Sequence, residues 1–154
     1  MAQVAVVIGS KTDEDFVKPA EEILEQFGII HETVVISAHR NPERLRKFVA
    51  NATDKGVEVI IAAAGAAAHL PGVIASLNNN AIPVIGVPLP TSDLKGIDSL
   101  YSIVQMPFGI PVACMGIGNS GTKNAALFAL QILALKYPEI RRKYIDYRKK
   151  LEEV

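Results

Sequence analysis

Five short apolar runs recur along this sequence. They span residues 4–8, 33–36, 59–63, 84–87 and 112–115. Apart from Thr33, their side chains are apolar and do not alternate with polar ones, which is typical of strands buried on both faces of a parallel sheet. Parallel neighbours need a crossover connection between one strand and the next, and that connection is usually a helix. The runs therefore predict an α/β domain built from repeated βα units.

The segments between the runs carry the signals of amphipathic helices. The first segment places Phe16, Ala20, Leu24 and Phe27 on one apolar stripe, and Gly28 follows in the usual position for a helix end. Further helices are expected from Pro42, at 71–77, near 99, at 125–135 and at 138–152. We expect one domain over residues 1–154, with three α/β/α layers around a doubly wound sheet. Five parallel strands favour the flavodoxin-like order.

Charge and hydropathy exclude several classes of protein. The 16 basic and 16 acidic side chains give a net charge of zero, so no polycationic surface for nucleic acid is expected. Residues 59–92 and 99–122 contain no charged side chain, but Pro, Gly and Asn interrupt both. Neither stretch supplies the roughly 20 unbroken apolar residues of a membrane span. Cys114 is the only cysteine and is expected to be a buried small hydrophobe, and the N-terminus has no secretory signal. We therefore expect a cytoplasmic protein.

The last two helices favour an oligomer. Residues 125–135 are apolar almost all the way round, so the helix they form must be covered on every side. A single sheet covers one side, and a neighbouring subunit is the simplest cover for the rest. The C-terminal helix offers a second apolar stripe formed by Ile140, Tyr144, Tyr147 and Leu151. We expect this helix to pack on a neighbouring subunit; the alternative is that the two helices cover each other within one chain.

Polar residues gather where the first two strands end. In a flavodoxin-like sheet, ligands bind outside the carboxyl ends of the strands. The segment 9–13, Gly-Ser-Lys-Thr-Asp, leads into a helix whose N-terminal N–H groups favour an anion. Taken alone, this segment fits an ordinary capped turn better than a phosphate site. After the second strand, Arg40 is suited to gripping a phosphate and His39 to moving a proton. A solvated arginine and a capping histidine are the alternative.

The segment after the third strand is rich in small residues. It runs Gly-Ala-Ala-Ala-His-Leu-Pro-Gly over residues 65–72. Bare backbone of this kind suits a small planar ligand such as a carboxylate or carbon dioxide. The same composition also fits close packing of a helix on the sheet, and His69 alone is as consistent with a structural role.

Two cofactor hypotheses fail on spacing. His31 opens the second strand and His39 follows its end, so at about 3.3 Å per residue they lie at opposite edges of the sheet and no three-histidine metal site forms. Residues 116–121 match the G-x-G-x-x-G dinucleotide pattern. However, no strand follows the next helix to present an acidic residue to a ribose. We expect neither a metal nor a dinucleotide.

Five segments in order along the chain resemble one family. They are Gly-Ser-Lys-Thr-Asp at 9–13, Ser-Ala-His-Arg-Asn-Pro at 37–42, Ala-Ala-His-Leu-Pro-Gly at 67–72, the run at 96–107 and Asn-Ala-Ala-Leu at 124–127. Through them the chain resembles, nearly end to end, the class I N5-carboxyaminoimidazole ribonucleotide mutases of purine biosynthesis. That family is also called the catalytic subunit of phosphoribosylaminoimidazole carboxylase. It usually has Gly at the position of Ala66.

The resemblance implies a flavodoxin-like subunit in a homo-octamer that acts on a small ribonucleotide and carbon dioxide without any cofactor. It implies that Thr12, Ser37 and Arg40 hold the substrate phosphate, with Ser10 helping. It assigns the ribose hydroxyls to Asp13.

The resemblance also implies the chemistry. His39 would be the general acid/base and His69 a second catalytic residue. The carbamate on the exocyclic amine would leave as carbon dioxide, which is trapped against the 65–69 loop and attacked by ring carbon 4. The remaining implied substrate-binding residues are Ala38, Gly65, Ala66, Ala67 and Leu70.

Two other functions stay open at this point. The first is the class II reaction, direct carboxylation of aminoimidazole ribonucleotide. That branch typically has Lys in place of Arg40 and lacks the His-Leu-Pro-Gly run at 69–72. The second is a non-catalytic nucleotide- or flavin-binding module, because a fold alone never determines function. Such a module leaves two histidines at one edge of the sheet unexplained.

Overall fold

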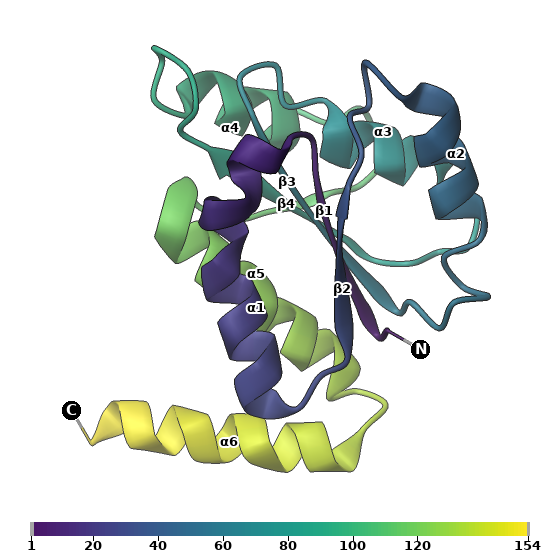
Figure 1. Ribbon diagram of the computed structural model, residues 1–154. Coiled ribbons are helices and arrows are strands. Elements are labelled where there is room, and N and C mark those ends of the chain that lie inside the picture. Colours follow the sequence, from purple (N-terminus) through teal and green to yellow (C-terminus); the bar gives the residue numbers. More distant parts are fainter. Residues whose placement is uncertain (1, 154) are drawn as a thin grey trace.

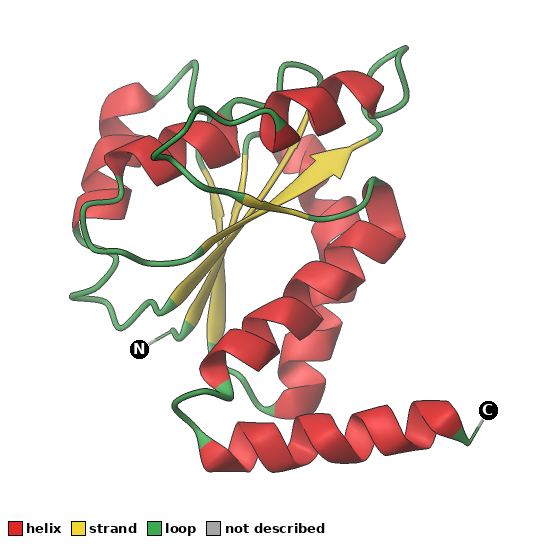
Figure 2. Cartoon of the chain, turned by 180° about the vertical axis from the view of Figure 1, so that it is seen from behind, coloured by secondary structure: helices red, strands yellow, loops and turns green. Residues whose placement is uncertain are grey.

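The computed structural model describes residues 2–153, which form three α/β/α layers around one sheet (Figures 1 and 2). The sheet has five parallel strands in the order β2-β1-β3-β4-β5. They are β1 (Val4–Ile8), β2 (His31–Val35), β3 (Val59–Gly65), β4 (Val84–Leu89) and β5 (Ala113–Cys114). The flavodoxin-like, doubly wound order predicted from the apolar runs is confirmed.

The strand boundaries differ from the predicted ones at the two edges of the sheet. β2 begins at His31 rather than at residue 33, and β5 keeps only two residues of the predicted 112–115. An edge strand pairs on one side only, so its apolar run is a weaker guide to its length. Cys114 is half-buried rather than fully buried, and burial raises the pKa of its thiol.

Helices cover both faces of the sheet, as Figure 2 shows from behind. On one face lie α1 (Glu14–Phe27), which follows a short 3-10 turn η1 (Lys11–Asp13), and α5 (Gly118–Leu133). On the other face lie α2 (Pro42–Ala50), α3 (Leu70–Leu77) and α4 (Ile97–Val104). The last helix, α6 (Pro138–Glu152), lies beside α1 and α5.

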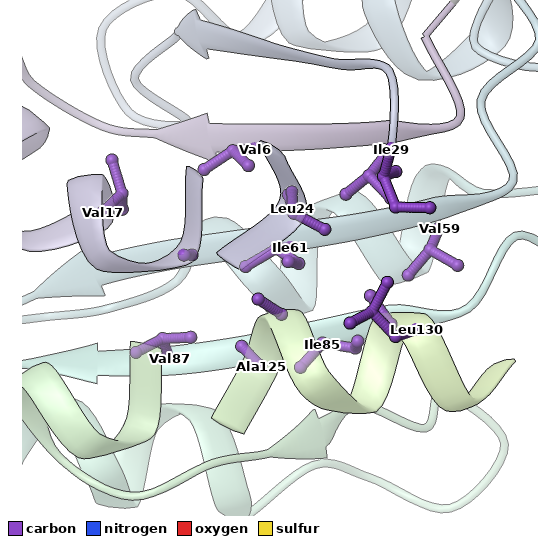
Figure 3. Packing of buried hydrophobic residues seen from close by; sticks show 14 of the residues in the cluster. Val6, Val17, Leu24, Ile29, Val59, Ile61, Ile85, Val87, Ala125 and Leu130 are labelled. Carbon is purple, nitrogen blue, oxygen red and sulfur yellow. The ribbon is translucent and has the colours of Figure 1, made fainter. Parts of the chain in front are cut away.

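The core is two apolar layers separated by the sheet. Because successive side chains of a strand point to opposite faces, Val6 and Ile61 pack toward Leu24 of α1 and Leu130 of α5 (Figure 3). Their strand neighbours pack toward α2 and α3 on the other face. All side chains of β1 have no exposed surface. Each fully buried Val, Leu or Ile stabilises the fold by about 1.5–3 kcal/mol, so the central strands are the most firmly held part of the chain.

The glycine pattern at 116–121 has a packing role. α5 begins at Gly118, inside the pattern, so the prediction of a helix starting at residue 125 was wrong by two turns. A Cβ atom added to Gly121 would lie 1.6 Å from the carbonyl oxygen of Gly116. Glycine at 121 therefore lets the helix turn back against the strand that precedes it.

α6 lies at the end of the molecule where the strands begin. Figure 1 shows it crossing the ends of α1 and α5 and extending beyond them. Tyr147 packs edge-on against Phe27, the last residue of α1, with ring centroids 5.7 Å apart, and Lys143 Nζ donates to the Phe27 carbonyl at 2.9 Å. Leu135 remains 89% exposed and Leu151 52% exposed, so mutual covering of α5 and α6 within one chain is incomplete.

Among the helices of residues 2–153, none combines the length and apolar character needed to cross a membrane.

One ion pair joins the α5–α6 connection to the segment before β3. Glu58 accepts hydrogen bonds from Lys136 Nζ at 2.7 Å and from the Tyr137 hydroxyl at 2.5 Å. Burial by itself would raise the pKa of the Glu58 carboxyl, but these hydrogen bonds and the Lys136 charge outweigh burial and leave the pKa below its usual value. The ionised form is therefore favoured in the folded chain.

We predict that Glu58→Gln lowers the free energy of unfolding at pH 7 and that this difference disappears in acid. A carboxylate whose pKa is lowered by folding stabilises the folded chain fully at pH values above its pKa in the unfolded chain, about 4.3. This stabilisation is lost as the pH falls through the lower pKa of the folded chain. Urea unfolding at pH 7, 5, 4 and 3 measures it. Lys18→Gln, which breaks the exposed pair with Asp15, is the control and should change little at any pH. An equal effect of Glu58→Gln at pH 3 and pH 7 would contradict the prediction.

Candidate active site

The strand register brings three loops level with one another at the carboxyl edge of the sheet. Ile8 of β1 is paired with Val35 of β2 on one side and with Ala63 of β3 on the other. Two residues further on, Ser10, Ser37 and Gly65 therefore begin their loops side by side. The loops enclose a cleft of about 460 Å³, within the range of about 300–1,000 Å³ for small-molecule sites.

The first loop forms the turn that enters α1. Ser10 caps η1, because its Oγ accepts from the Thr12 backbone N–H at 3.3 Å and from Thr12 Oγ1 at 2.9 Å. Asp13 then occupies the N-cap position of α1 without a capping bond from its side chain. Its carboxyl is buried, and burial raises its pKa, although hydrogen bonds from Ser10 and Thr12 and the charge of Arg40 partly oppose this. The loop presents hydroxyls and a carboxyl to the cleft.

The second loop is a tight turn that carries Arg40 against the first loop. The Ser37 Oγ accepts from the Arg40 backbone N–H at 3.2 Å, which closes the turn. The Arg40 Nη2 donates to the Gly9 carbonyl at 3.1 Å. This bond ties the guanidinium to the first loop. Its other N–H groups make no hydrogen bond within residues 2–153, so they can bind a ligand. Asn41 occupies the N-cap position of α2 but makes no capping bond with its side chain.

Two histidines from different loops meet at the cleft. His39 Nε2 lies 2.8 Å from His69 Nδ1, a hydrogen-bond distance. The rings are nearly perpendicular at 82°, with centroids 4.9 Å apart. One nitrogen of this pair donates and the other accepts, so the contact couples the tautomer of each ring to that of the other. Both side chains are exposed to solvent in the single chain.

The fourth strand also contributes to the cleft. Gly65 of β3 is paired with Leu89 of β4, so the loop after β4 starts at the same level, and its Thr91 lines the cleft. A Cβ atom added to Gly65 would lie 1.6 Å from Thr91 Oγ1. Glycine at 65 is therefore required by the position of Thr91.

A second cavity of about 700 Å³ adjoins the cleft and shares Gly9, Ser10, Ser37 and Arg40 with it. Lys11 and Arg44 also line this cavity, and Arg44 Nη1 donates to the Val35 carbonyl at 3.1 Å. Three cationic side chains, Lys11, Arg40 and Arg44, thus line this cavity, which shares Ser10 and Ser37 with the cleft. An anion bound there would be attracted by all three.

The structure brings nearly all the predicted site residues to one cleft. Its lining includes Ser10, Thr12, Asp13, Ser37, Ala38, His39, Arg40, Gly65, Ala67, His69 and Leu70. Ala66 belongs to the same loop but does not line the cleft. Thr91 and Arg44 were missed. The rule that ligands bind at carboxyl ends, extended to the fourth strand, would have found Thr91; no signal in the sequence separates Arg44 from other exposed helix arginines.

His31 is placed at the first position of β2, opposite Val4, and so lies at the other end of the strand from the loop that carries His39. Within residues 2–153 no group of three or more His, Cys, Asp or Glu side chains is arranged to hold a metal ion.

Comparison with known proteins identifies the family. The model of the AIR carboxylase family matches residues 3–154, nearly the whole chain. The chain belongs to the AIR carboxylase family. The resemblance inferred from the five sequence segments is thereby confirmed.

Several relatives in the AIR carboxylase family have the name N5-carboxyaminoimidazole ribonucleotide mutase. The protein of Thermotoga maritima is 51% identical over 99% of this chain and 86% of its own length. The Saccharolobus solfataricus protein is 55% identical over 93% of this chain and 88% of its own length. The Escherichia coli K12 protein is 50% identical over 96% of this chain and 86% of its own length. Among solved structures, Treponema denticola PurE superposes with a TM-score of 0.84 at 26% identity and covers 97% of this chain and 91% of that one.

In this member of the AIR carboxylase family, Ala66 has a left-handed backbone with φ of 50°. Glycine adopts that conformation freely, whereas a Cβ atom costs roughly 1–2 kcal/mol there. The tight turn that follows is closed by hydrogen bonds from the Ala68 N–H to the Ala66 carbonyl and from the His69 N–H to the Ala67 carbonyl, both 2.8 Å. The glycine usual in the family at this position therefore has a backbone reason, and Ala66 is not among the residues that line the cleft.

We predict that Ala66→Gly is neutral or raises the free energy of unfolding by up to about 1 kcal/mol, because relief of the left-handed strain offsets the greater freedom of the unfolded chain. Ala67→Gly is the matched control. The backbone of residue 67 is not left-handed, so this variant should lower the free energy of unfolding by about 0.4–1 kcal/mol. Urea unfolding of both variants measures the difference. Equal losses would show that the backbone of residue 66 is unstrained.

Proposed function

We propose that this chain is an N5-carboxyaminoimidazole ribonucleotide mutase, an isomerase that interconverts N5-carboxyaminoimidazole ribonucleotide and 4-carboxyaminoimidazole ribonucleotide in purine biosynthesis. The single observation that carries the proposal is the 2.8 Å contact between His39 and His69 in a cleft that also holds Arg40 and a loop of small residues. This reaction needs a side chain that carries a proton, a side chain that binds the substrate phosphate, and space for carbon dioxide. The names of the relatives support the same assignment.

The polar end of the cleft suits a ribose 5-phosphate. In the proposal, the phosphate accepts hydrogen bonds from Ser10, Thr12 and Ser37 and from the free N–H groups of Arg40. Hydrogen bonds to a charged group are roughly twice as strong as neutral ones. Asp13 faces the same cleft and would accept from the ribose hydroxyls. These contacts fix the imidazole ring at the other end, beside the two histidines.

The chemistry then needs one proton that is given and recovered. When the bond between the exocyclic nitrogen and the carboxyl carbon breaks, its electron pair stays on nitrogen, which takes a proton from His39 as carbon dioxide leaves. Ring carbon 4 attacks the carbon dioxide and becomes tetrahedral. His39 then removes the proton from carbon 4, whose C–H electrons restore the aromatic ring. No proton is gained or lost over the cycle, so a single imidazole is sufficient.

His69 assists as the hydrogen-bond partner of His39. The contact limits rotation of the His39 ring, because turning it would break a hydrogen bond worth about 0.5–1.5 kcal/mol. It also selects which nitrogen of His39 is free to face the substrate. Ala38 and Leu70, the sequence neighbours of His39 and His69, also line the cleft. In the proposal they make apolar contact with the imidazole ring of the substrate.

The small residues of the third loop serve the carbon dioxide. That molecule has no charge and binds weakly, so it must be kept by enclosure rather than by affinity. Ala67 leaves room next to His69, Ala66 shapes the turn before it, and Gly65 lets the Thr91 side chain lie against the backbone of the loop. A larger side chain would fill the space in which the carboxyl group moves from nitrogen to carbon.

The proposal extends to the assembly and its location. Several large apolar side chains are exposed in the single chain, among them Tyr101 at 62%, Phe108 at 106% and Leu135 at 89%. Surfaces of this kind mark interaction sites. We propose a homo-octamer in the cytoplasm, in which α6 packs on a neighbouring subunit.

We predict that His39→Asn lowers turnover of the carbamate substrate by at least about 10²-fold, the usual contribution of a positioned acid/base, while binding of the substrate survives. Steady-state assays and equilibrium titration measure the two effects. His31→Asn, at the other end of the sheet, is the control and should leave both unchanged.

The same assay, with the two substrates offered separately, tests the reaction itself. Turnover of N5-carboxyaminoimidazole ribonucleotide by the wild type is expected. Turnover only of aminoimidazole ribonucleotide with bicarbonate would replace the mutase assignment by direct carboxylation. Unchanged function of His39→Asn would instead indicate a binding module.

A further inference from the structure

Thr91 is the one residue beyond β4 that lines the cleft, and no role follows for it from the sequence motifs. It stands directly over the backbone of Gly65. A Cβ atom built on Gly65 would lie 1.6 Å from Thr91 Oγ1, 2.9 Å from its Cβ and 3.2 Å from its Cγ2. The hydroxyl is the nearest of these three atoms. Thr91 therefore occupies the position that a side chain at residue 65 would take.

The residues on both sides of Thr91 are anchored. Before it, the Leu89 carbonyl accepts from the buried Ser99 hydroxyl at 3.0 Å. After it, the Ser92 hydroxyl donates to Asp98 Oδ2 at 2.6 Å and accepts from the Leu94 N–H at 3.2 Å. The hydrogen bond from Ser92 lowers the pKa of the Asp98 carboxyl. The hydroxyl of Ser92 is thus engaged within the loop. Within residues 2–153 the Thr91 hydroxyl makes no hydrogen bond, and Thr91 lines the cleft.

Two glycines lie near Pro90, and a side chain at either would reach Pro90 only at van der Waals distance. A Cβ atom at Gly96 would lie 3.4 Å from Pro90 Cα, and one at Gly118 would lie 3.7 Å from its ring. Gly96 also has a φ of 93°, which other residues rarely adopt. Pro90 itself has a fixed φ. The loop is therefore rigid where it presents Thr91, and a rigid support is what a precise ligand contact requires.

We propose that the Thr91 hydroxyl donates a hydrogen bond to an oxygen of the carboxyl group as that group moves from nitrogen to carbon, and that residue 65 is glycine so that this hydroxyl can reach it. This inference rests on the proposed function. Carbon dioxide is neutral, but its oxygens gain negative charge as the new carbon–carbon bond forms. A fixed neutral donor therefore stabilises the transition state more than it stabilises free carbon dioxide.

The test follows the fate of a labelled carboxyl group. The wild type and variants receive N5-carboxyaminoimidazole ribonucleotide with ¹³C in the carbamate, and the fraction of label that reaches carbon 4 is compared with the fraction lost as free ¹³CO₂. Thr91→Val keeps the shape but lacks the hydroxyl. We expect the ratio of transferred to lost label to fall about tenfold in Thr91→Val, the loss of one hydrogen bond to a group gaining charge. KM should change little, because the phosphate contacts are intact.

Two further variants distinguish the hydroxyl from its surroundings. Thr91→Ser keeps the hydroxyl and should retain a ratio close to that of the wild type. Ser92→Ala removes the neighbouring hydroxyl, which does not line the cleft; it should lower stability without changing the ratio. Thermal unfolding shows whether each variant is folded, and Thr91→Ala replaces Thr91→Val if valine prevents folding.

The outcomes separate this inference from the proposed function. An unchanged ratio in Thr91→Val, or an equal loss in Thr91→Ser, would overturn the role of the hydroxyl while the wild type still converts the carbamate. If the wild type does not convert the carbamate at all, the proposed function itself fails and the inference fails with it.

Discussion

The site depends on the register of three parallel strands. Pairing of Ile8 with Val35 and with Ala63 determines that the loops after β1, β2 and β3 start at one level. A slip of one residue in a strand would turn its side chains to the opposite face. Because both faces of β1 are buried in packed cores, such a slip would force side chains of a different size into the core on each face. The apolar core therefore holds His39 and His69 within hydrogen-bond distance although neither histidine belongs to it.

Glycine positions give the second constraint, because they set how closely backbone and side chains approach. At Gly121 the missing Cβ lets α5 return against Gly116, and at Gly65 it makes room for Thr91. These are different uses of one property. The first closes a strand-to-helix connection, and the second places a hydroxyl on bare backbone at the mouth of the cleft. Ala66 lies next to Gly65 with a left-handed backbone and does not line the cleft, so the same loop accepts a Cβ at the next residue.

Most of the fold and much of the candidate site could be predicted from the sequence. The same physical reasons explain where the predictions were wrong. Uniform apolar runs identify buried central strands such as β1 and β3, since both faces must be covered. They describe edge strands less well, and β5 shrank to two residues. The start of α5 was missed because the helix was predicted only over the apolar run at 125–135. The helix begins at Gly118, which has a φ of 72°, and Gly121 is required by its close approach to Gly116. The polar loops predicted the cleft. They did not predict the contact between His39 and His69 or the position of Thr91. Both depend on contacts between segments that are distant in the sequence, and hydrophobic periodicity carries no information about such contacts.

The candidate site is exposed to solvent in the single chain, and this exposure explains why the proposed reaction would need an assembly of subunits. His39, Arg40, Ala67, His69 and Thr91 are all solvent-exposed in the single chain. A reaction that releases carbon dioxide and recaptures it loses the gas to water unless the cleft is covered during the step. In the proposed complex the substrate, with its phosphate near Arg40, would cover one side of the cleft and leave the other side open. A neighbouring subunit can close that side with apolar surface, which excludes water without competing for the hydrogen bonds of the two histidines. In the proposed octamer the same apolar contacts that hold subunits together would keep the cleft dry, so assembly and catalysis would depend on one surface.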